Sequence, residues 1–247
     1  MFHEQDHAGL RYPPTRRVEQ VDDYHGTRVS DPYRWLEDTD APDTRAWIEA
    51  QNRLTSAYLA SVPQRAAIER RMTELWDYPR WGVPFREGGR VFFHRNDGLQ
   101  NQPVLYVQPE PGAEPRVVLD PNTLSEDGTV SLSTSVVSDD GEKLVYGVSS
   151  GGSDWQEFRV REVSTGRDLP DVLKWIKFST ASWTRDGAGF FYSRYPEPEG
   201  NALTSALSGQ RLYYHRLGTP QSEDALVYER PDAPELGFSA VVTDDGR

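Results

Sequence analysis

The sequence contains no cysteine, few lysines and no long apolar run. Without cysteine there can be no disulfide, no thiolate nucleophile and no cysteine-ligated metal, so a disulfide-built secreted fold is excluded. No stretch approaches the roughly 18 apolar residues of a membrane span, and the first residues show no signal peptide. We therefore expect a protein of the cytoplasm that has no membrane partner, no metal and no cofactor.

Charge of the positive sign is also scarce, because 39 acidic residues face 27 basic ones and the formal net charge is −12. Nucleic-acid binding needs a basic face, and anionic membrane surfaces attract basic segments. The acidic balance therefore argues against both partners. Hydrophobic residues make up 36% of the chain and aromatic residues 11%, which is enough for a core in one large all-β domain or one to two ordinary domains.

Residues 1–79 are predicted to form an N-terminal helical segment after an extended start. A short helix is expected over residues 31–38, a longer one from Pro42, and a third after Pro63 that ends at Asp77-Tyr-Pro79. Apolar residues at helical spacing mark one face of the two longer helices, and we interpret that face as core. The residues of this expected core are Trp47, Leu54, Tyr58, Ile68, Met72 and Leu75.

From about residue 80 the pattern changes to short alternating strands that repeat at long spacing. Four polar turns end in glycine, and a β-rich strand follows each of the first three. Asp-Gly is a strong hairpin signal because the turn needs positive φ. A second strand beginning with glutamine follows in the first three repeats, and a further strand follows in the first and third. Four strands per repeat of roughly 40 to 50 residues are typical of a β-propeller blade. The glycines are Gly88, Gly141, Gly187 and Gly246, and the glutamines are Gln102, Gln156 and Gln210.

The predicted fold is therefore mainly β, with an incomplete β-propeller over residues 80–247. About three blades and the start of a fourth are expected, at 80–130, 131–175, 176–233 and from about 236. The strand that should follow Gly246 is missing, and a propeller generally needs at least four blades to close. We therefore expect this chain to be the front part of a longer protein.

The motif Gly151-Gly-Ser-Asp-Trp155 raises the question of a serine nucleophile. The hydrolase turn G-x-S-x-G lies between a strand and a helix, and it needs glycine two places after the serine. Here Trp155 occupies that place, and the segments on both sides have strand patterns. We therefore predict that Ser153 lies in a loop between two strands and is not a nucleophile.

Six segments spread over nearly the whole chain resemble the N-terminal part of the prolyl oligopeptidase family. They cover about the first third of a typical member of that family. The segments are Tyr24-His-Gly, Asp31-Pro-Tyr-Arg-Trp-Leu-Glu-Asp, Gly152-Ser-Asp-Trp155, Trp175-Ile-Lys-Phe-Ser179, Leu212-Tyr-Tyr-His-Arg-Leu-Gly-Thr219 and Gln221-Ser-Glu-Asp224.

The resemblance implies a serine endopeptidase that cleaves short peptides after proline with a Ser-Asp-His triad. In this family a seven-bladed propeller caps an α/β-hydrolase domain, on which the N-terminal helical segment packs. The triad belongs to the C-terminal hydrolase region, so no catalytic residue is expected here. The five histidines, His3, His7, His25, His94 and His215, are interpreted as ordinary surface or hydrogen-bonded residues.

Three substrate-binding residues are implied by the resemblance. Asp154 corresponds to an acid that pairs with an arginine of the hydrolase domain beside the substrate; alternatively it only satisfies backbone donors of its own turn. Phe178 corresponds to an aromatic residue that lines the pocket for the residue two before the proline, or it is a blade-core residue. Gly237 falls where relatives have a pocket methionine, so this wall of the pocket is expected to differ, with Leu236 or Phe238 as candidates to fill the space.

The implied partners are short proline-containing peptides and a C-terminal α/β-hydrolase domain. The main alternative is a non-catalytic β-propeller that serves as a binding scaffold. A propeller glycosidase is a weaker alternative, because its Asp-box repeats carry a tryptophan at fixed spacing that Ser138-Asp-Asp-Gly-Glu-Lys-Leu lacks.

Overall fold

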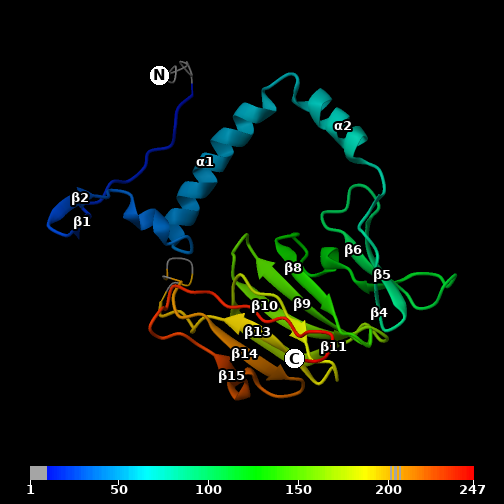
Figure 1. The fold of residues 1–247 in the computed structure, drawn as a ribbon. Coiled ribbons are helices and arrows are strands. Elements are labelled where there is room, and N and C mark those ends of the chain that lie inside the picture. Colours follow the sequence, from blue (N-terminus) through cyan, green and yellow to red (C-terminus); the bar gives the residue numbers. More distant parts are fainter. Residues whose placement is uncertain (1–9, 201, 203–204, 206) are drawn as a thin grey trace. The chain divides into compact units, whose positions relative to one another are not determined.

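The computed structural model describes residues 10–200, 202, 205 and 207–247, and its contacts divide the chain into two compact units. The first unit is Met1–Leu75 and the second is Trp76–Arg247 (Figure 1). The functional domain limits expected from the sequence, 1–79 and 80–247, remain a prediction.

The first unit contains a hairpin followed by three helices. Strands β1 (Val21–Tyr24) and β2 (Thr27–Ser30) pair antiparallel, and they precede the 3-10 helix η1 (Arg34–Glu37), α1 (Pro42–Ala60) and α2 (Arg65–Trp76). The three predicted helices are confirmed, but the sequence analysis missed the hairpin. Its two turn residues, His25 and Gly26, have φ of 56° and 90°, as a two-residue hairpin turn of the mirror-image type requires.

The start of α1 follows from local chemistry. Ala41 is extended, Pro42 occupies the first turn where its missing N–H costs nothing, and Asp43 lies where the helix dipole favours a negative charge. The prediction that the apolar face of the helices is core is wrong for this chain. Thr44 is the one buried residue that the structure describes in α1, and α2 has none. Met72 is 64% exposed, since an apolar stripe is buried only where another surface covers it.

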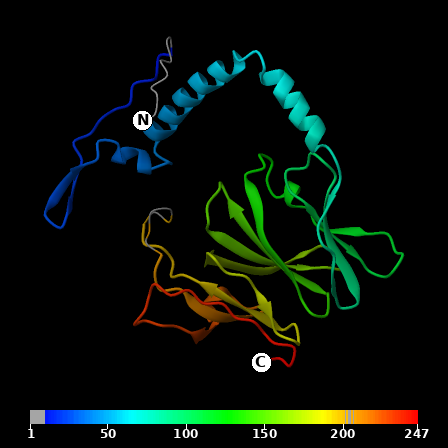
Figure 2. The same cartoon turned by 45° about the horizontal axis from the view of Figure 1, so that its top comes forward.

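The second unit contains three sheets that lie side by side (Figures 1 and 2). All strand pairs are antiparallel, and each sheet matches one predicted blade, which confirms the propeller pattern. Blade one is β3 (Arg80–Trp81), β4 (Phe85–Glu87), β5 (Arg90–Asn96), β6 (Val104–Gln108) and β7 (Arg116–Leu119). Blade two is β8 (Val130–Val137), β9 (Lys143–Ser150), β10 (Gln156–Glu162) and β11 (Asp168–Ile176). Blade three is β12 (Ser182–Trp183), β13 (Gly189–Arg194), β14 (Arg211–Arg216) and β15 (Ala225–Tyr228).

Two short 3-10 helices, η2 (Pro121–Thr123) and η3 (Gln221–Glu223), lie in the connections of the second unit. Residues 229–247 contain no strand, and the fourth blade therefore remains a prediction. No helix that the structure describes is both long and apolar enough to cross a membrane.

The repeated turns share a hydrogen-bond pattern that explains their sequence. The Ser138 hydroxyl donates to Asp140 Oδ1 (2.6 Å), and the same carboxylate oxygen accepts from the Glu142 N–H (2.9 Å). Thr184 and Thr243 make the corresponding bonds to Asp186 and Asp245, at 2.7 and 2.6 Å. In the last three of the four turns, a hydroxyl two residues before the aspartate is therefore part of the motif together with the glycine, whereas the first turn, at Gly88, has no such hydroxyl.

The residue in the second position of these turns connects one blade to the next. Arg185 pairs with Asp139 of the preceding turn (Nη1 to Oδ2, 2.7 Å) and with Asp244 of the following turn (Nη2 to Oδ1, 3.4 Å). Between blades one and two, Arg90 donates to the Asp140 carbonyl (3.1 Å) and binds Glu142 (2.5 Å). The turns are thus linked along the row of blades.

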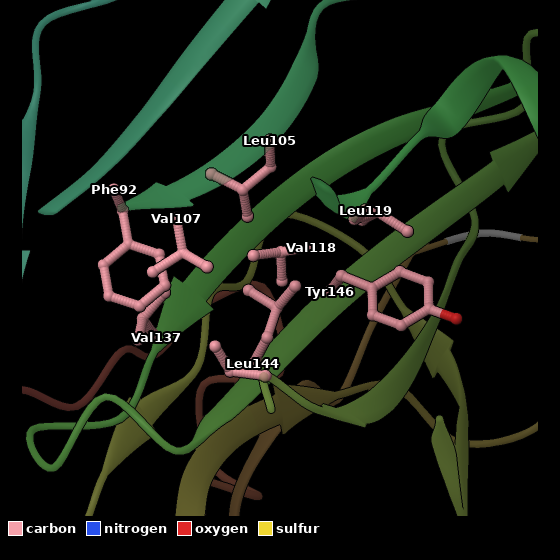
Figure 3. Close-up of a cluster of buried hydrophobic side chains, with 9 residues drawn as sticks. Phe92, Leu105, Val107, Val118, Leu119, Val137, Leu144 and Tyr146 are labelled. Carbon is pink, nitrogen blue, oxygen red and sulfur yellow. The ribbon is translucent and has the colours of Figure 1, made fainter. Parts of the chain in front are cut away.

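Apolar side chains fill the space between neighbouring sheets. Between blades one and two, Phe92 and Leu105 pack with Leu144 and Tyr146, all fully buried (Figure 3). Between blades two and three, a second cluster joins Phe158 and Val160 with side chains of β12 and β13. Each blade therefore depends on its neighbour to bury its own face.

A buried polar group lies at the junction of blades two and three. His215 on β14 binds Asp224 through Nδ1 (2.7 Å) and Asp171 on β11 through Nε2 (2.9 Å), and all three side chains are at most 1% exposed. The Tyr192 hydroxyl donates to the other oxygen of Asp224 (2.5 Å). Burial alone lowers the pKa of His215, but the hydrogen bonds and charges of Asp224 and Asp171 outweigh it and raise that pKa above its usual value.

Candidate functional site

The three predicted substrate-binding residues lie in loops at the same edge of the sheets. Because consecutive strands alternate in direction, the loop 151–155 after β9, the connection 177–181 after β11 and the segment 236–238 after β15 all leave from one edge, which we call the loop edge. The glycine turns 138–141 and 184–187 leave from the opposite edge. Topology therefore places Asp154, Phe178 and Gly237 on a common side.

The loop 151–155 connects two strands, as predicted for Ser153. Strand β10 follows instead of a helix, and the Ser153 hydroxyl oxygen accepts the Trp155 N–H (3.1 Å). Ser153 thus satisfies the backbone donor of this turn. The Asp154 carboxylate is exposed and has no hydrogen bond or ion pair with any residue that the structure describes. It is available to a partner outside the loop.

Trp155 anchors this loop to two neighbouring segments. Its ring meets Trp175 and Tyr195 edge to face, with centroids 5.8 and 6.2 Å apart, and its indole N–H donates to the Ala202 carbonyl (2.8 Å). The Lys177 ammonium lies 4.3 Å from the ring centroid, a cation–π contact, and the lysine is only 8% exposed. Burial also raises the pKa of the Tyr195 hydroxyl.

Phe178 has an unusual backbone and an exposed ring. Its φ is 52°, in the left-handed region that bulky residues rarely adopt, and Trp175 three residues earlier has φ of 62°. The Phe178 side chain is 67% exposed, so it is not buried within the three blades that the structure describes. Strained residues of this kind persist only where the surrounding structure holds them, and they are frequent at ligand sites.

Two buried polar residues, Gln210 and Ser193, make hydrogen bonds to the residues on both sides of Phe178 and to Phe238. Gln210 donates through Nε2 to the Lys177 carbonyl (3.1 Å) and accepts the Phe238 N–H at Oε1 (2.6 Å). Ser193 donates its hydroxyl to the Phe238 carbonyl (2.7 Å), and its own N–H donates to the Ser179 hydroxyl (2.9 Å). Gln210 is 3% and Ser193 0% exposed. We call this pair the bracket.

Gly237 is exposed and lies against the bracket. A Cβ at this position would lie 3.1 Å from Gln210 Oε1, so a side chain here requires Gln210 to move. The neighbouring Phe238 ring packs edge to face on Tyr228 (5.2 Å), whereas Leu236 is 42% exposed. Of the two proposed substitutes for the missing methionine, Leu236 has the free side chain.

Two clefts flank Trp155 at the loop edge. One, of about 460 Å³, is lined by Leu124, Val148, Gln156 and Trp175 among others, and the Glu157–Arg159 ion pair (2.6 Å) lies at its wall. The other, of about 410 Å³, has a mixed lining, with Tyr195, Pro196, Pro198 and Leu207 beside Glu197, Glu199, Ser205 and Ser208. The aromatic and aliphatic parts of these walls suit apolar side chains.

The histidines offer no general base beside a nucleophile within the described residues. His3 and His7 lie outside the part of the chain that the structure describes, and His25 is in the β1–β2 turn. Burial lowers the pKa of His94, and both ring nitrogens of His215 are bonded to carboxylates. Residues 10–200, 202, 205 and 207–247 also hold no cluster of three or more His, Asp or Glu residues suited to a metal ion.

Four residues of the site were missed in the sequence analysis: Trp155 as an anchor, Lys177, Ser193 and Gln210. A signal existed for Gln210, because glutamine begins the second strand in each repeat. Gln102 has a related role, since its amide donates to the Val130 carbonyl (2.8 Å) and accepts the Leu132 N–H (2.8 Å). Gln156 of the second repeat differs, because its buried side-chain oxygen has no hydrogen-bond partner among the described residues.

Comparisons with known proteins identify the relatives of this chain. A family model described as prolyl oligopeptidase, N-terminal beta-propeller domain, matches residues 13–247. The prolyl endopeptidase of Elizabethkingia meningoseptica is 42% identical over 96% of this chain and 34% of its own length. A solved structure from a study of two prolyl endopeptidases has a TM-score of 0.84 at 36% identity, covering 96% of this chain and 35% of that one.

A second solved structure is prolyl oligopeptidase B from Galerina marginata, bound to a 35mer hydrolysis and macrocyclization substrate. Its TM-score is 0.78 at 33% identity, and the match covers 95% of this chain and 36% of the other. The chain thus spans about a third of the length of these relatives. The family resemblance seen in the sequence is confirmed.

Proposed function

The chain belongs to the prolyl oligopeptidase family, and on this premise we propose that it supplies the N-terminal helical segment and part of the propeller of a serine endopeptidase. In this proposal the enzyme cleaves short proline-containing peptides after proline, and the propeller limits access to the active site. The nucleophile, base and oxyanion hole come from a C-terminal α/β-hydrolase domain. The family match over residues 13–247 carries the proposal.

In this proposal Asp154 forms an ion pair with an arginine of the hydrolase domain. The exposed carboxylate without a partner among the described residues supports this role, because an acid that only stabilised its own turn would accept backbone donors there. Trp155 fixes the loop from which Asp154 projects through three contacts. A preorganised carboxylate loses little freedom when its partner binds.

Phe178 contributes a wall of the subsite that takes the peptide residue two before the proline. Its ring is exposed, yet the carbonyl before it and the hydroxyl after it are both hydrogen-bonded, so the ring offers an apolar surface with little cost of ordering. Leu236, beside Gly237, supplies part of the same region. The helical segment uses its exposed apolar face to pack on the hydrolase domain.

The test is Phe178→Ala in a protein that carries the hydrolase region after this chain. Phe178 touches the peptide away from the scissile bond, so its loss should raise KM and leave kcat nearly unchanged. Removal of one apolar wall contact, about 1–2 kcal/mol, corresponds to about a five- to thirtyfold lower kcat/KM. The loss should be large for a bulky apolar residue at this subsite and small for glycine.

The matched control is Trp81→Ala, which removes an aromatic side chain of blade one that is 61% exposed. It should leave the peptide preference unchanged. The pocket role would be contradicted if Phe178→Ala lowered the thermal stability but left the peptide preference of the protein unchanged.

A further inference from the structure

Phe178 and Phe238 are far apart in the sequence, but Gln210 and Ser193 each connect the segment beside Phe178 with Phe238. Gln210 bonds the carbonyl immediately before Phe178 and the N–H of Phe238. The Ser193 main-chain N–H donates to the side-chain hydroxyl of Ser179, immediately after Phe178, and the Ser193 hydroxyl donates to the Phe238 carbonyl. The backbone before Phe178 is thus held by Gln210, the side chain after it is bonded to β13, and both backbone polar groups of Phe238 are engaged.

The bracket explains how a strained aromatic residue stays exposed. A non-glycine residue in the left-handed region is strained, and an exposed ring gains little burial to offset that strain. The Gln210–Lys177 bond of the bracket is buried and the other three are partly buried, and an unmade bond is costly where water is excluded. They therefore oppose relaxation of the Phe178 backbone, and they transmit any shift of the Phe238 segment to Phe178.

We propose that Gln210 and Ser193 are positioning residues of the substrate pocket, which set the orientation of Phe178 and couple it to the wall at Leu236–Phe238. They touch no substrate and act through these two segments. The proposal rests on the proposed function, since it takes Phe178 as the wall of a peptide subsite. It adds two specificity-determining residues from the interior of blade three.

Gln102 provides a matched control because it makes the same kind of amide bridge elsewhere. Its bonds join the start of β6 to the Val130 carbonyl and the Leu132 N–H of blade two, and none involves Phe178 or Phe238. Gln210→Met and Gln102→Met each remove a similar pair of bonds at similar side-chain volume. A purely structural role for both residues predicts similar consequences.

The first measurement uses the chain as it is, with residue-resolved hydrogen exchange by NMR. In Gln210→Met the Phe238 amide loses its acceptor and should exchange faster, whereas Gln102→Met should leave it unchanged and accelerate the Leu132 amide instead. If the Phe238 amide exchanged at the same rate in Gln210→Met and in the unsubstituted chain, the claim that Gln210 holds the Phe238 segment would be wrong.

The second measurement uses the chain continued by a hydrolase region. Gln210→Met should raise KM about three- to tenfold for peptides with a bulky apolar residue at the subsite, and it should change kcat by less than about twofold. A rise of this size corresponds to the loss of one or two hydrogen bonds. The same substitution in a Phe178→Ala background should change KM little, because the residue through which Gln210 acts is gone. Gln102→Met should leave KM unchanged in both backgrounds.

The outcomes separate the two proposals. No effect of Phe178→Ala alone contradicts the pocket role of Phe178, and with it the proposed function. Two outcomes overturn the positioning role and leave the pocket role of Phe178 intact. In one, Phe178→Ala raises KM and Gln210→Met adds the same further rise in KM in the Phe178→Ala background. In the other, Gln102→Met raises KM as much as Gln210→Met does.

Discussion

The stability of blade three should decrease as pH rises above neutrality, because of His215. The folded pKa of His215 is raised by its two carboxylates above the usual value of about 6.5. A raised pKa contributes stability that is fully present below the unfolded pKa and is lost as pH rises through the folded pKa. Each unit of elevation corresponds to about 1.4 kcal/mol of unfolding free energy.

The two carboxylates that face the imidazole determine this sign, and they outweigh the opposing effect of burial. Asp171 and Asp224 are the charged groups bound to it, the Gly218 N–H also donates to Asp171 Oδ1 (2.6 Å), and the Tyr192 hydroxyl donates to Asp224. Phe190 packs on the ring (5.4 Å). Loss of the imidazolium proton leaves two buried carboxylates with one ring N–H between them.

The assay is urea unfolding of the chain followed by circular dichroism between pH 6 and 9, for the unsubstituted chain and His215→Gln. The variant should lose about 3–5 kcal/mol at pH 6, the usual cost of removing one partner of a buried ion pair, and this difference should shrink at pH 9. His94 has a lowered pKa and the opposite slope, but it is present in both proteins and cancels. A difference that is constant with pH would refute the reasoning.

Three further predictions concern the chain as it stands. It should not hydrolyse proline-containing reporter peptides, and turnover that disappears in Ser153→Ala would revive Ser153 as a nucleophile. It should self-associate through the exposed face of α2, where Ile68 is 55% and Met72 64% exposed; a single monomeric species in sedimentation experiments would contradict this. Gly88→Ala should destabilise the chain by several kcal/mol because its Cβ would lie 1.8 Å from the Asp140 carbonyl oxygen, whereas Gly89→Ala, also at positive φ but with free space, should cost about 1–2 kcal/mol in the same melts.

Blades and helices could be predicted from the sequence because their signals are local. Asp-Gly turns need positive φ at one position, and Pro42 and Pro63 mark helix starts within a few residues. The apolar stripe of α2 was recognised, but the pattern identifies a side of a helix and not the surface that covers it. This is why Ile68, Met72 and Leu75 were wrongly expected in a core.

The site was less predictable because it depends on long-range contacts. The Lys177-Phe178 segment follows an apolar strand, and its sequence does not show that Phe178 has positive φ and points to solvent. Gln210 lies 33 residues from Lys177 and 28 from Phe238, and no periodicity links such positions. The resemblance directed attention to Phe178, whereas the residues that hold it became visible only in three dimensions.

The second residue of the glycine turns differs in charge between otherwise similar repeats. Arg185 attracts Asp139 before it and Asp244 after it, while two acidic turns placed next to each other would repel. Exposed ion pairs of this kind contribute little to stability, but they discriminate between correct and incorrect neighbours. The charge of Arg185 therefore favours the observed neighbours of blade three over an arrangement that places another basic turn beside it.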